Sequence, residues 1–124
     1  MRADTMMPLL NVADVAASLA WYAHLGLQEL QRRERDGVPQ WALLGLGPHR
    51  LMLSRSDRPA PGKRRGGMVL YLGVADAHAA HRALSAAGLS PGPVERQRYG
   101  VDEFGLRDPD GYELAVTGEP VQLA

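Results

Sequence analysis

Hydrophobic and polar residues follow the same order in the two halves of the chain. Each half begins with an apolar run typical of a buried strand, first Met7 to Val12 and then Met68 to Val74. An aspartate that suits a helix N-cap comes after each run, Asp14 in the first half and Asp76 in the second. An Ala-rich stretch with apolar residues at helical spacing comes next. Each half is therefore predicted to start with a strand and a helix.

Glycines and turn residues predict where these elements end. Gly26 and Gly88 stand at the ends of the two predicted helices, where glycine is the common C-terminal cap. Polar turns such as Asp36-Gly37 and Pro109-Asp110-Gly111 divide the remainder of each half into strands. These strands are expected at 28–35, 40–46 and 49–55 in the first half, and at 92–98, 103–108 and 112–117 in the second. The pattern predicts strand-helix-strand-strand-strand, or βαβββ, in both halves.

An internal repeat supports this organisation. Val12-Ala13-Asp14 recurs as Val74-Ala75-Asp76, an offset of 62 residues in a chain of 124. Between the halves lies a segment rich in Pro, Gly and basic residues, which is typical of a connector. We expect an α+β protein with one domain over residues 1–124, built from tandem βαβββ modules at 5–56 and 68–118 that a connector at 57–67 joins.

Composition and charge narrow the function classes. The 14 Lys and Arg balance the 14 Asp and Glu, so no overall field favours nucleic acid or an anionic membrane as a partner. The chain has no cysteine, which excludes disulfides, thiolate metal sites and cysteine nucleophiles. No apolar run reaches the length of a membrane span or a signal peptide, so we expect a cytoplasmic protein.

Three segments resemble the vicinal oxygen chelate superfamily, which includes glyoxalase I, extradiol dioxygenases and bleomycin-resistance proteins. They are residues 9–27, 70–89 and 99–116. The last segment, YGVDEFGLRDPDGYELAV, is the most specific and is most similar to the bleomycin-resistance branch. The resemblance implies a bacterial protein whose two modules form a cupped mixed β-sheet. It also implies a homodimer with two equivalent grooves for a small organic ligand.

The metal-dependent members of this superfamily carry ligands on the inward strands. Counting to the same places gives Met7, Met52, Val69 and Ala115. None of these side chains supplies the imidazole nitrogen or carboxylate oxygen that such an ion needs. The four histidines are predicted to be surface, turn or helix-end residues rather than ligands. We therefore expect neither a metal nor another cofactor. The absence of metal ligands at these positions also argues against an enzyme, without excluding one.

One carboxylate is predicted to face the cup. Glu113 lies two residues before Ala115 and so shares its side of the strand, where it is a weak candidate for proton transfer. The alternative is a structural role in which Arg107 pairs with Glu113.

Aromatic and apolar side chains complete the predicted ligand-binding set. Trp41, Tyr99 and Phe104 are the candidates for stacking on a flat ligand, because the resemblance implies this role for rings on such strands and loops. Tyr71 shares a strand face with Val69 and joins them. Met7, Met52, Val69, Glu113 and Ala115 are expected to line the remaining surface. The sequence leaves open whether these side chains line an open cup or fill it as core.

Three functions compete. The leading hypothesis is a non-catalytic protein that sequesters an aromatic or flat secondary metabolite or antibiotic, as in drug resistance or self-resistance. The alternatives are a metal-dependent lyase, isomerase or dioxygenase of the superfamily, and a metal-free enzyme of secondary metabolism. The neutral net charge argues mildly against the strongly acidic groove that a polycationic drug would favour.

Overall fold

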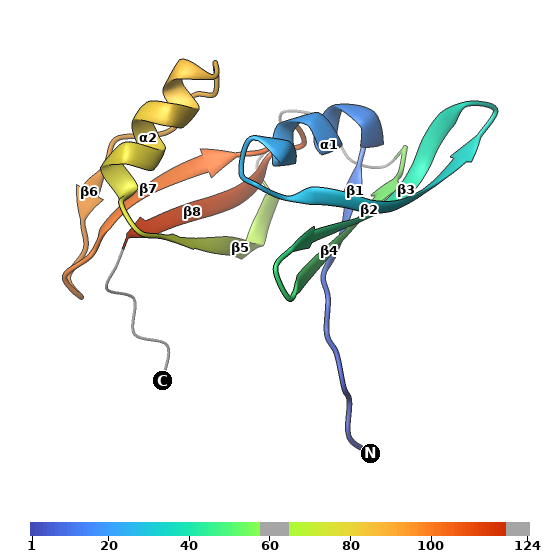
Figure 1. Ribbon diagram of the computed structural model, residues 1–124, viewed down its shortest axis with the longest axis horizontal. Helices are drawn as coiled ribbons and strands as arrows, with labels where there is room; N and C mark the ends of the chain where they lie inside the picture. The colour runs from blue at the N-terminus through green and yellow to red at the C-terminus, as the bar shows by residue number, and fades with distance from the viewer. Residues whose placement is uncertain (58–64, 119–124) are drawn as a thin grey trace. The chain divides into compact units, whose positions relative to one another are not determined.

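The computed structural model describes residues 1–57 and 65–118, and of Arg65 and Gly66 it describes the backbone alone. The chain forms two compact units, Met1–Gly62 and Lys63–Ala124, which we call unit 1 and unit 2. Unit 1 holds β1 (Leu9–Val12), α1 (Val15–Ala23), β2 (Gln28–Arg35), β3 (Val38–Leu46) and β4 (His49–Arg55). Unit 2 holds β5 (Arg65–Val74), α2 (Ala77–Ala86), β6 (Glu95–Arg96), β7 (Asp102–Arg107) and β8 (Tyr112–Gly118). The predicted βαβββ order occurs in both units (Figure 1).

The two sheets have the same topology. The strand order is β1-β4-β3-β2 in unit 1 and β5-β8-β7-β6 in unit 2. In each sheet the first strand pairs in parallel with the last, and the other pairs are antiparallel. The predicted α+β fold with mixed sheets is thus confirmed, as two four-stranded sheets.

Both helices begin at the predicted aspartates. The Asp14 carboxylate accepts a hydrogen bond from the backbone N–H of Ala17, and that of Asp76 accepts one from Ala79, each at 3.1 Å. The backbone angles of the two caps agree within one degree, with φ −141° and ψ 105° at Asp14 and φ −140° and ψ 105° at Asp76. These bonds satisfy donors that a helix start otherwise leaves unpaired. The sequence repeat is therefore also a repeat of local geometry.

Both helices end just before the predicted glycines. Gly26 and Gly88 have positive φ angles of 92° and 91°, a conformation that costs glycine little. Beyond Gly88, the N–H of Leu89 donates to the carbonyl of Leu84 at 3.0 Å, which is the long hydrogen bond of a Schellman motif. The chain therefore turns back towards its sheet after each helix.

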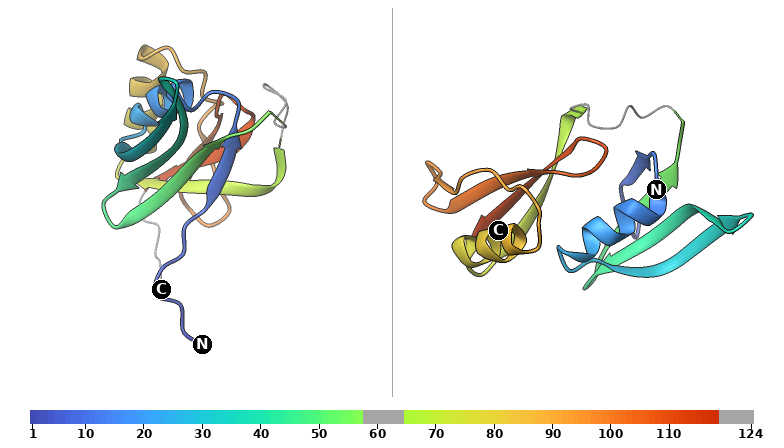
Figure 2. Two further views of the ribbon diagram at one scale, coloured as in Figure 1. Left: turned by 90° about the vertical axis from the view of Figure 1, so that its right-hand side faces the viewer. Right: turned by 90° about the horizontal axis from the view of Figure 1, so that it is seen from above.

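The core of each unit lies between its helix and one face of its sheet (Figure 2). In unit 1 one residue from each of β1, β3 and β4 faces the helix, namely Leu10, Leu44 and Leu53. These three are at most 1% exposed, and Tyr22 of α1 is buried with them. In unit 2 the same role falls to side chains of β7 and β8 together with one of α2, namely Phe104, Leu106, Leu114, Val116 and Leu84. The period of two along a strand leaves the intervening side chains on the other face, which no helix of the same unit covers within the described residues.

Some boundaries differ from the sequence-based prediction. Strand β5 begins at Arg65, inside the predicted connector, and a register irregularity separates Arg65 from Val69. Strand β6 has two residues where seven were expected, because the chain pairs with β7 only at Glu95 and Arg96. The rest of the connector, residues 58–64, lies outside the described residues. Within the described ranges, the helices are too short to cross a membrane.

Candidate ligand-binding site

The sheet of unit 1 has an apolar face opposite α1. Leu43 of β3 and Leu9 of β1 both pair with Met52 of β4, so the three side chains leave the sheet on the same side. Leu9 is 46% exposed, and Leu43 and Met52 are half-buried. Met7 lies two residues before β1 and is 37% exposed. We call this surface the helix-free face of unit 1.

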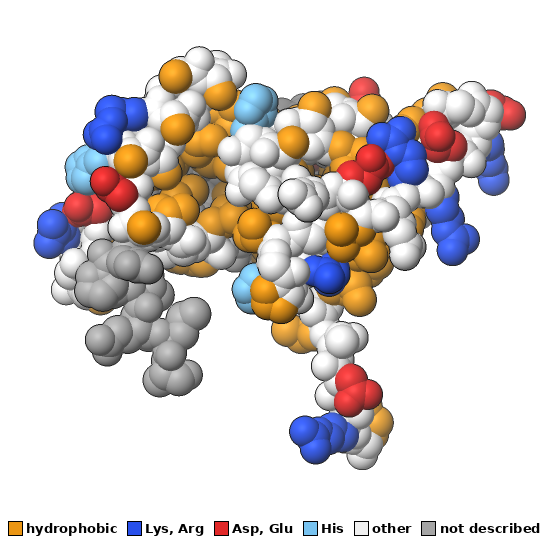
Figure 3. Space-filling view, in the orientation of Figure 1, with side chains coloured by type: hydrophobic (Ala, Val, Ile, Leu, Met, Phe, Trp, Pro, Cys, Tyr) orange, Lys and Arg blue, Asp and Glu red, His pale blue; other side chains and the backbone are white. Residues whose placement is uncertain are grey.

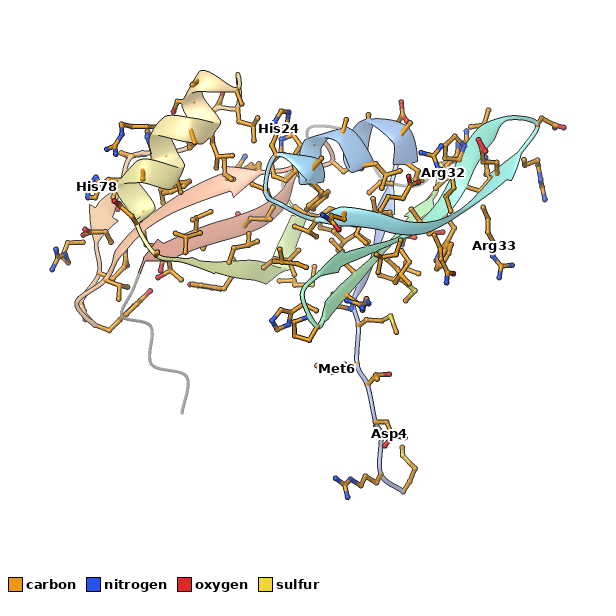
Figure 4. All side chains as sticks on the ribbon, viewed as in Figure 1. Asp4, Met6, His24, Arg32, Arg33 and His78 are labelled. Atoms are coloured by element: carbon orange, nitrogen blue, oxygen red, sulfur yellow. The ribbon has the colours of Figure 1, made fainter. Side chains whose placement is uncertain are left out.

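Trp41 lies on the same face beside a cation. Trp41 of β3 pairs with Arg33 of β2, and the guanidinium carbon lies 5.8 Å from the centre of the indole ring. This distance is within the range of a cation–π interaction. The neighbouring Arg32 projects to the opposite side of β2, where it forms an ion pair with Glu29 (Figure 4). The β2–β3 hairpin therefore carries charge over both of its faces (Figure 3).

The helix-free face of unit 2 brings together four of the predicted residues. Val69 and Tyr71 of β5 pair with Glu113 and Ala115 of β8, respectively, so all four side chains lie on one side of the sheet. Val69 is 43% and Tyr71 62% exposed, whereas Ala115 is buried. Arg107 of β7 lies directly opposite Glu113, as the structural alternative for this carboxylate requires.

A cavity of about 240 Å³ opens on this face where β6 meets β7. The two carboxylates in its lining, those of Glu95 and Glu103, belong to residues that pair directly across the two strands. The cavity is lined by Gly92, Pro93, Glu95, Gln97, Glu103, Phe104, Gly105 and Ala115.

Tyr99 lies beside this cavity and is 63% exposed. Its hydroxyl donates a hydrogen bond of 2.6 Å to Oε2 of Glu103. The hydrogen bond and the charge of Glu103 raise the pKa of Tyr99 to about 12, since ionised Tyr99 would lose the bond and face a carboxylate. Tyr71 pairs with Ala115, which lines the cavity, so its ring lies on the same face of the sheet.

The ring of Phe104 belongs to the opposite face. Phe104 is 3% exposed and packs edge-on against the imidazole of His81 of α2, with ring centres 5.2 Å apart. This burial leaves little ring surface for stacking, so Phe104 stays a proposed lining residue of the cavity rather than a stacking one. Nε2 of His81 lies 3.0 Å from the carbonyl oxygen of Gly92, and the Gly92 N–H donates to the carbonyl of Gly105. Phe104 and His81 therefore support the segment that lines the cavity.

The fold and these faces can be compared with known proteins. A sequence profile of the Glyoxalase/Bleomycin resistance protein/Dioxygenase superfamily matches residues 3–116. The chain belongs to this superfamily. No curated protein matches the sequence.

Several solved structures share the fold at low sequence identity. TioX from Micromonospora sp. ML1 has a TM-score of 0.75 at 22% identity, over 94% of this chain and 98% of TioX. A bleomycin-binding protein complexed with bleomycin gives 0.69 at 22% identity, over 94% and 99% of the chains. Lactoylglutathione lyase from Agrobacterium tumefaciens gives 0.69 at 21% identity, over 95% of each chain. At these identities the comparison supports the fold and leaves the ligand open.

The residues at the superfamily's metal positions do not fit a metal ion. Met7, Met52, Val69 and Ala115 offer no nitrogen or oxygen donor for a catalytic cation. Within 1–57 and 65–118, no three His, Asp or Glu side chains lie close enough to hold one. The only carboxylate among the expected lining residues is Glu113, which faces Arg107 across the strands. We therefore derive no chemical step through a metal.

A second cavity lies on the other side of unit 1. It has a volume of about 620 Å³ between α1 and β2, and Ala16, Ala20 and Ala23 form its helical wall. Neither this cavity nor the one beside Glu95 was expected from the sequence. The helical spacing of the alanines was visible, but alanines at such spacing are equally typical of a helix packed in a core.

Proposed function

We propose that the protein binds a small organic molecule without transforming it, and that it sequesters an aromatic or flat secondary metabolite or antibiotic in drug resistance or self-resistance. The observation that carries the proposal is the exposure of apolar and aromatic side chains on the helix-free faces. Leu9, Val69 and Tyr71 are 46%, 43% and 62% exposed. Exposed apolar surface of this kind, taken on each unit by itself, is typical of a binding site.

Two exposed aromatic rings and the half-buried ring of Trp41 support a flat ligand. Trp41 and Tyr71 lie on strand faces, and Tyr99 lies beside the cavity. The guanidinium of Arg33 lies over one side of the Trp41 indole. Stacking on such a ring contributes about 0.5–1.5 kcal/mol beyond the area that is buried. The bleomycin-bound relative agrees with small-molecule binding in this fold.

We further propose that the protein is a cytoplasmic bacterial homodimer with neither nucleic acid nor membrane as a partner. The sheets end in edge strands, β1 and β2 in unit 1 and β5 and β6 in unit 2. Such edges are commonly covered or paired in native proteins. Sedimentation equilibrium that gives a monomer at micromolar concentration would contradict the dimer.

The alternative is an enzyme of the same superfamily. The similarity in fold to lactoylglutathione lyase favours it, and elemental analysis separates a metal-dependent enzyme from the proposed binder. Stoichiometric Ni, Zn, Mn or Fe in the purified protein would contradict the metal-free binder. A metal-free enzyme would instead turn over a metabolite, and Glu113→Gln would abolish the turnover.

Fluorescence tests the proposal directly. The probe is 9-anthracenemethanol, a neutral flat molecule that absorbs where tryptophan emits. We expect saturable quenching that Trp41→Ala reduces, with an affinity loss of about two- to tenfold from one lost ring contact. Trp21→Phe is the matched control, because Trp21 lies on α1 with its ring against Tyr22 and Phe can keep that contact.

Two outcomes count against the proposal. If calorimetry and fluorescence both detect no saturable binding of the probe, the helix-free faces are not a site for flat molecules. If Trp41→Ala binds as tightly as the unaltered protein, Trp41 is not part of the site.

A further inference from the structure

Two glutamates of unit 2 lie directly opposite each other and line one cavity. Glu95 of β6 pairs with Glu103 of β7 in the antiparallel register, which brings their side chains to the same face. Like charges at directly opposed positions destabilise a strand pair. The pair therefore has an electrostatic cost that a bound cation would remove.

The described part of the chain supplies no cation to offset this cost. Within residues 1–57 and 65–118, neither Glu95 nor Glu103 forms an ion pair with Arg, Lys or His. The nearby Arg96 is engaged by Asp102, with Nε 2.7 Å from Oδ1. At the other end of the same face Arg107 opposes Glu113. The excess of negative charge is thus localised at the cavity.

Aromatic rings lie on one side of the two carboxylates, and a buried hydroxyl without a hydrogen-bond partner among the described residues lies on the other. The Tyr99 hydroxyl donates to one oxygen of Glu103, and Tyr71 pairs with Ala115 of the cavity lining on the same face. Thr117 of β8 lies directly opposite Glu103, so its side chain leaves the sheet on this face. Thr117 is 5% exposed, and its buried hydroxyl has no hydrogen-bond partner among the described residues. Such an orphaned group is unusual and indicates a missing polar partner.

The size of the cavity sets the size of its occupant. Its volume of about 240 Å³ is below the range of about 300–1,000 Å³ that holds a whole drug-sized ligand. It therefore suits a head group whose remainder lies elsewhere on the face. The hydrogen bond between His81 and the Gly92 carbonyl holds one wall in place, so part of the cavity is formed before a ligand arrives.

We propose that the cavity lined by Glu95 and Glu103 is a cation subsite that takes the protonated amine of a flat aromatic ligand. The proposal rests on the proposed function and names the charge class of its ligand. Two carboxylates accept hydrogen bonds from an ammonium group, and the rings of Tyr71 and Tyr99 favour the cation and the adjoining carbons. An organic cation fits better than a metal ion, because no third His, Asp or Glu of the described residues joins the two carboxylates.

Three probes with one ring system test the charge preference. They are 9-(aminomethyl)anthracene, which is a cation at neutral pH, anthracene-9-carboxylate, which is an anion, and neutral 9-anthracenemethanol. Calorimetric titration of the full chain is expected to give at least about tenfold tighter binding of the cation than of the anion. The preference is expected to decrease as salt is added, because the carboxylates are partly exposed.

Substitutions locate the preference. Glu103→Gln and Glu95→Gln each remove one charge, and the amide oxygen that Glu103→Gln introduces would still accept the hydrogen bond from Tyr99. Each variant is expected to bind the cation about tenfold more weakly and the neutral probe unchanged. Glu34→Gln is the control, since it removes the same charge from an exposed position of β2. Circular dichroism verifies that every variant is folded.

The outcomes separate the two proposals. If all three probes bind equally, or if the Glu95 and Glu103 variants keep the preference for the cation, the cation subsite is wrong and the proposed function stands. If no probe binds, both proposals fail. If Glu34→Gln weakens the cation as much as Glu103→Gln does, the preference comes from overall charge and the subsite is again wrong.

Discussion

Replacing Phe104 by Ala distinguishes a core residue from a ligand contact. The sequence placed this ring in the ligand-binding set, whereas the structure buries it between β7 and α2, edge-on to His81. Tyr71 provides the matched comparison, because it is an aromatic residue of the same sheet that lies on the helix-free face and is 62% exposed. The two substitutions should therefore have opposite consequences.

The expected loss of stability follows from the burial of the ring. An aromatic side chain buries about 150–250 Å². At about 25 cal/mol per Å² this area contributes about 4–6 kcal/mol, which is an upper bound because the unfolded chain is not fully extended. Measured Phe to Ala substitutions in cores cost about 3–5 kcal/mol, which we expect for Phe104→Ala. The loss is a large part of the roughly 5–15 kcal/mol that stabilises a typical domain.

Urea unfolding followed by circular dichroism measures this loss. Tyr71→Ala is expected to change the free energy of unfolding by about 0.5 kcal/mol or less, as exposed positions do, and to weaken binding of 9-(aminomethyl)anthracene. If Phe104→Ala fails to fold, Phe104→Leu gives a smaller loss of about 1 kcal/mol with binding retained. A Phe104→Ala protein that is as stable as the parent but binds the probe more weakly would refute the assignment of this ring to the core.

Further predictions concern the helix caps and one carboxylate. Asp14→Ala and Asp76→Ala should each lower the free energy of unfolding by about 1 kcal/mol, and the Asn variants should restore most of it; thermal melts that show no loss would contradict the caps. The hydrogen bond from Arg96, and to a lesser degree that from His78, lowers the pKa of Asp102 below its usual 3.8. Because the folded-state pKa is the lower one, this carboxylate stabilises the fold above its unfolded pKa, and the contribution is lost as pH falls through the folded value. NMR titration should show a larger rise in this pKa for Arg96→Ala than for His78→Ala, and an equal rise would disprove the order of causes.

Elements defined by local signals were predictable from the sequence. The bounds of β2 and β4 agree with the prediction, because the turn residues around Gly37 and Gly47 fix the ends of these strands. The helix starts agree because an aspartate side chain caps the backbone only three residues away. The repeat with an offset of 62 residues was predictive for the same reason, since it copied these local signals into both halves.

The sequence also predicts on which side of β7 the ring of Phe104 lies, through the alternation of apolar and polar residues. Phe104 and Leu106 alternate with the polar Glu103 and Arg107 along β7, and both apolar residues are buried. The period of two in this strand therefore assigns the ring to the core face. Grouping Phe104 with Tyr99 because they flank one loop did not use this alternation, which puts Phe104 and its neighbour Glu103 on opposite sides of β7.

The partnership of Glu95 with Glu103 could not be predicted, because it depends on the register of a strand with only two residues. The hydrogen bond from the Gln97 N–H to the Val101 carbonyl closes the turn and sets this register, and no turn motif in the sequence specifies it.

The same register shows how the net charge of the chain and the charge at one place on its surface can differ. Net charge sums over residues irrespective of position, whereas a ligand responds to the charges within about one Debye length, roughly 8–10 Å. Pairing across β6, β7 and β8 puts Glu95 opposite Glu103 but Glu113 opposite Arg107. Among the described residues, one end of this face therefore has two opposed carboxylates, and the other has a carboxylate opposite a cation. A neutral chain can in this way present a locally acidic cavity. The cation preference that we propose for this cavity depends on that pairing, and Glu103→Gln tests it by removing one of the two charges while the strand register is kept.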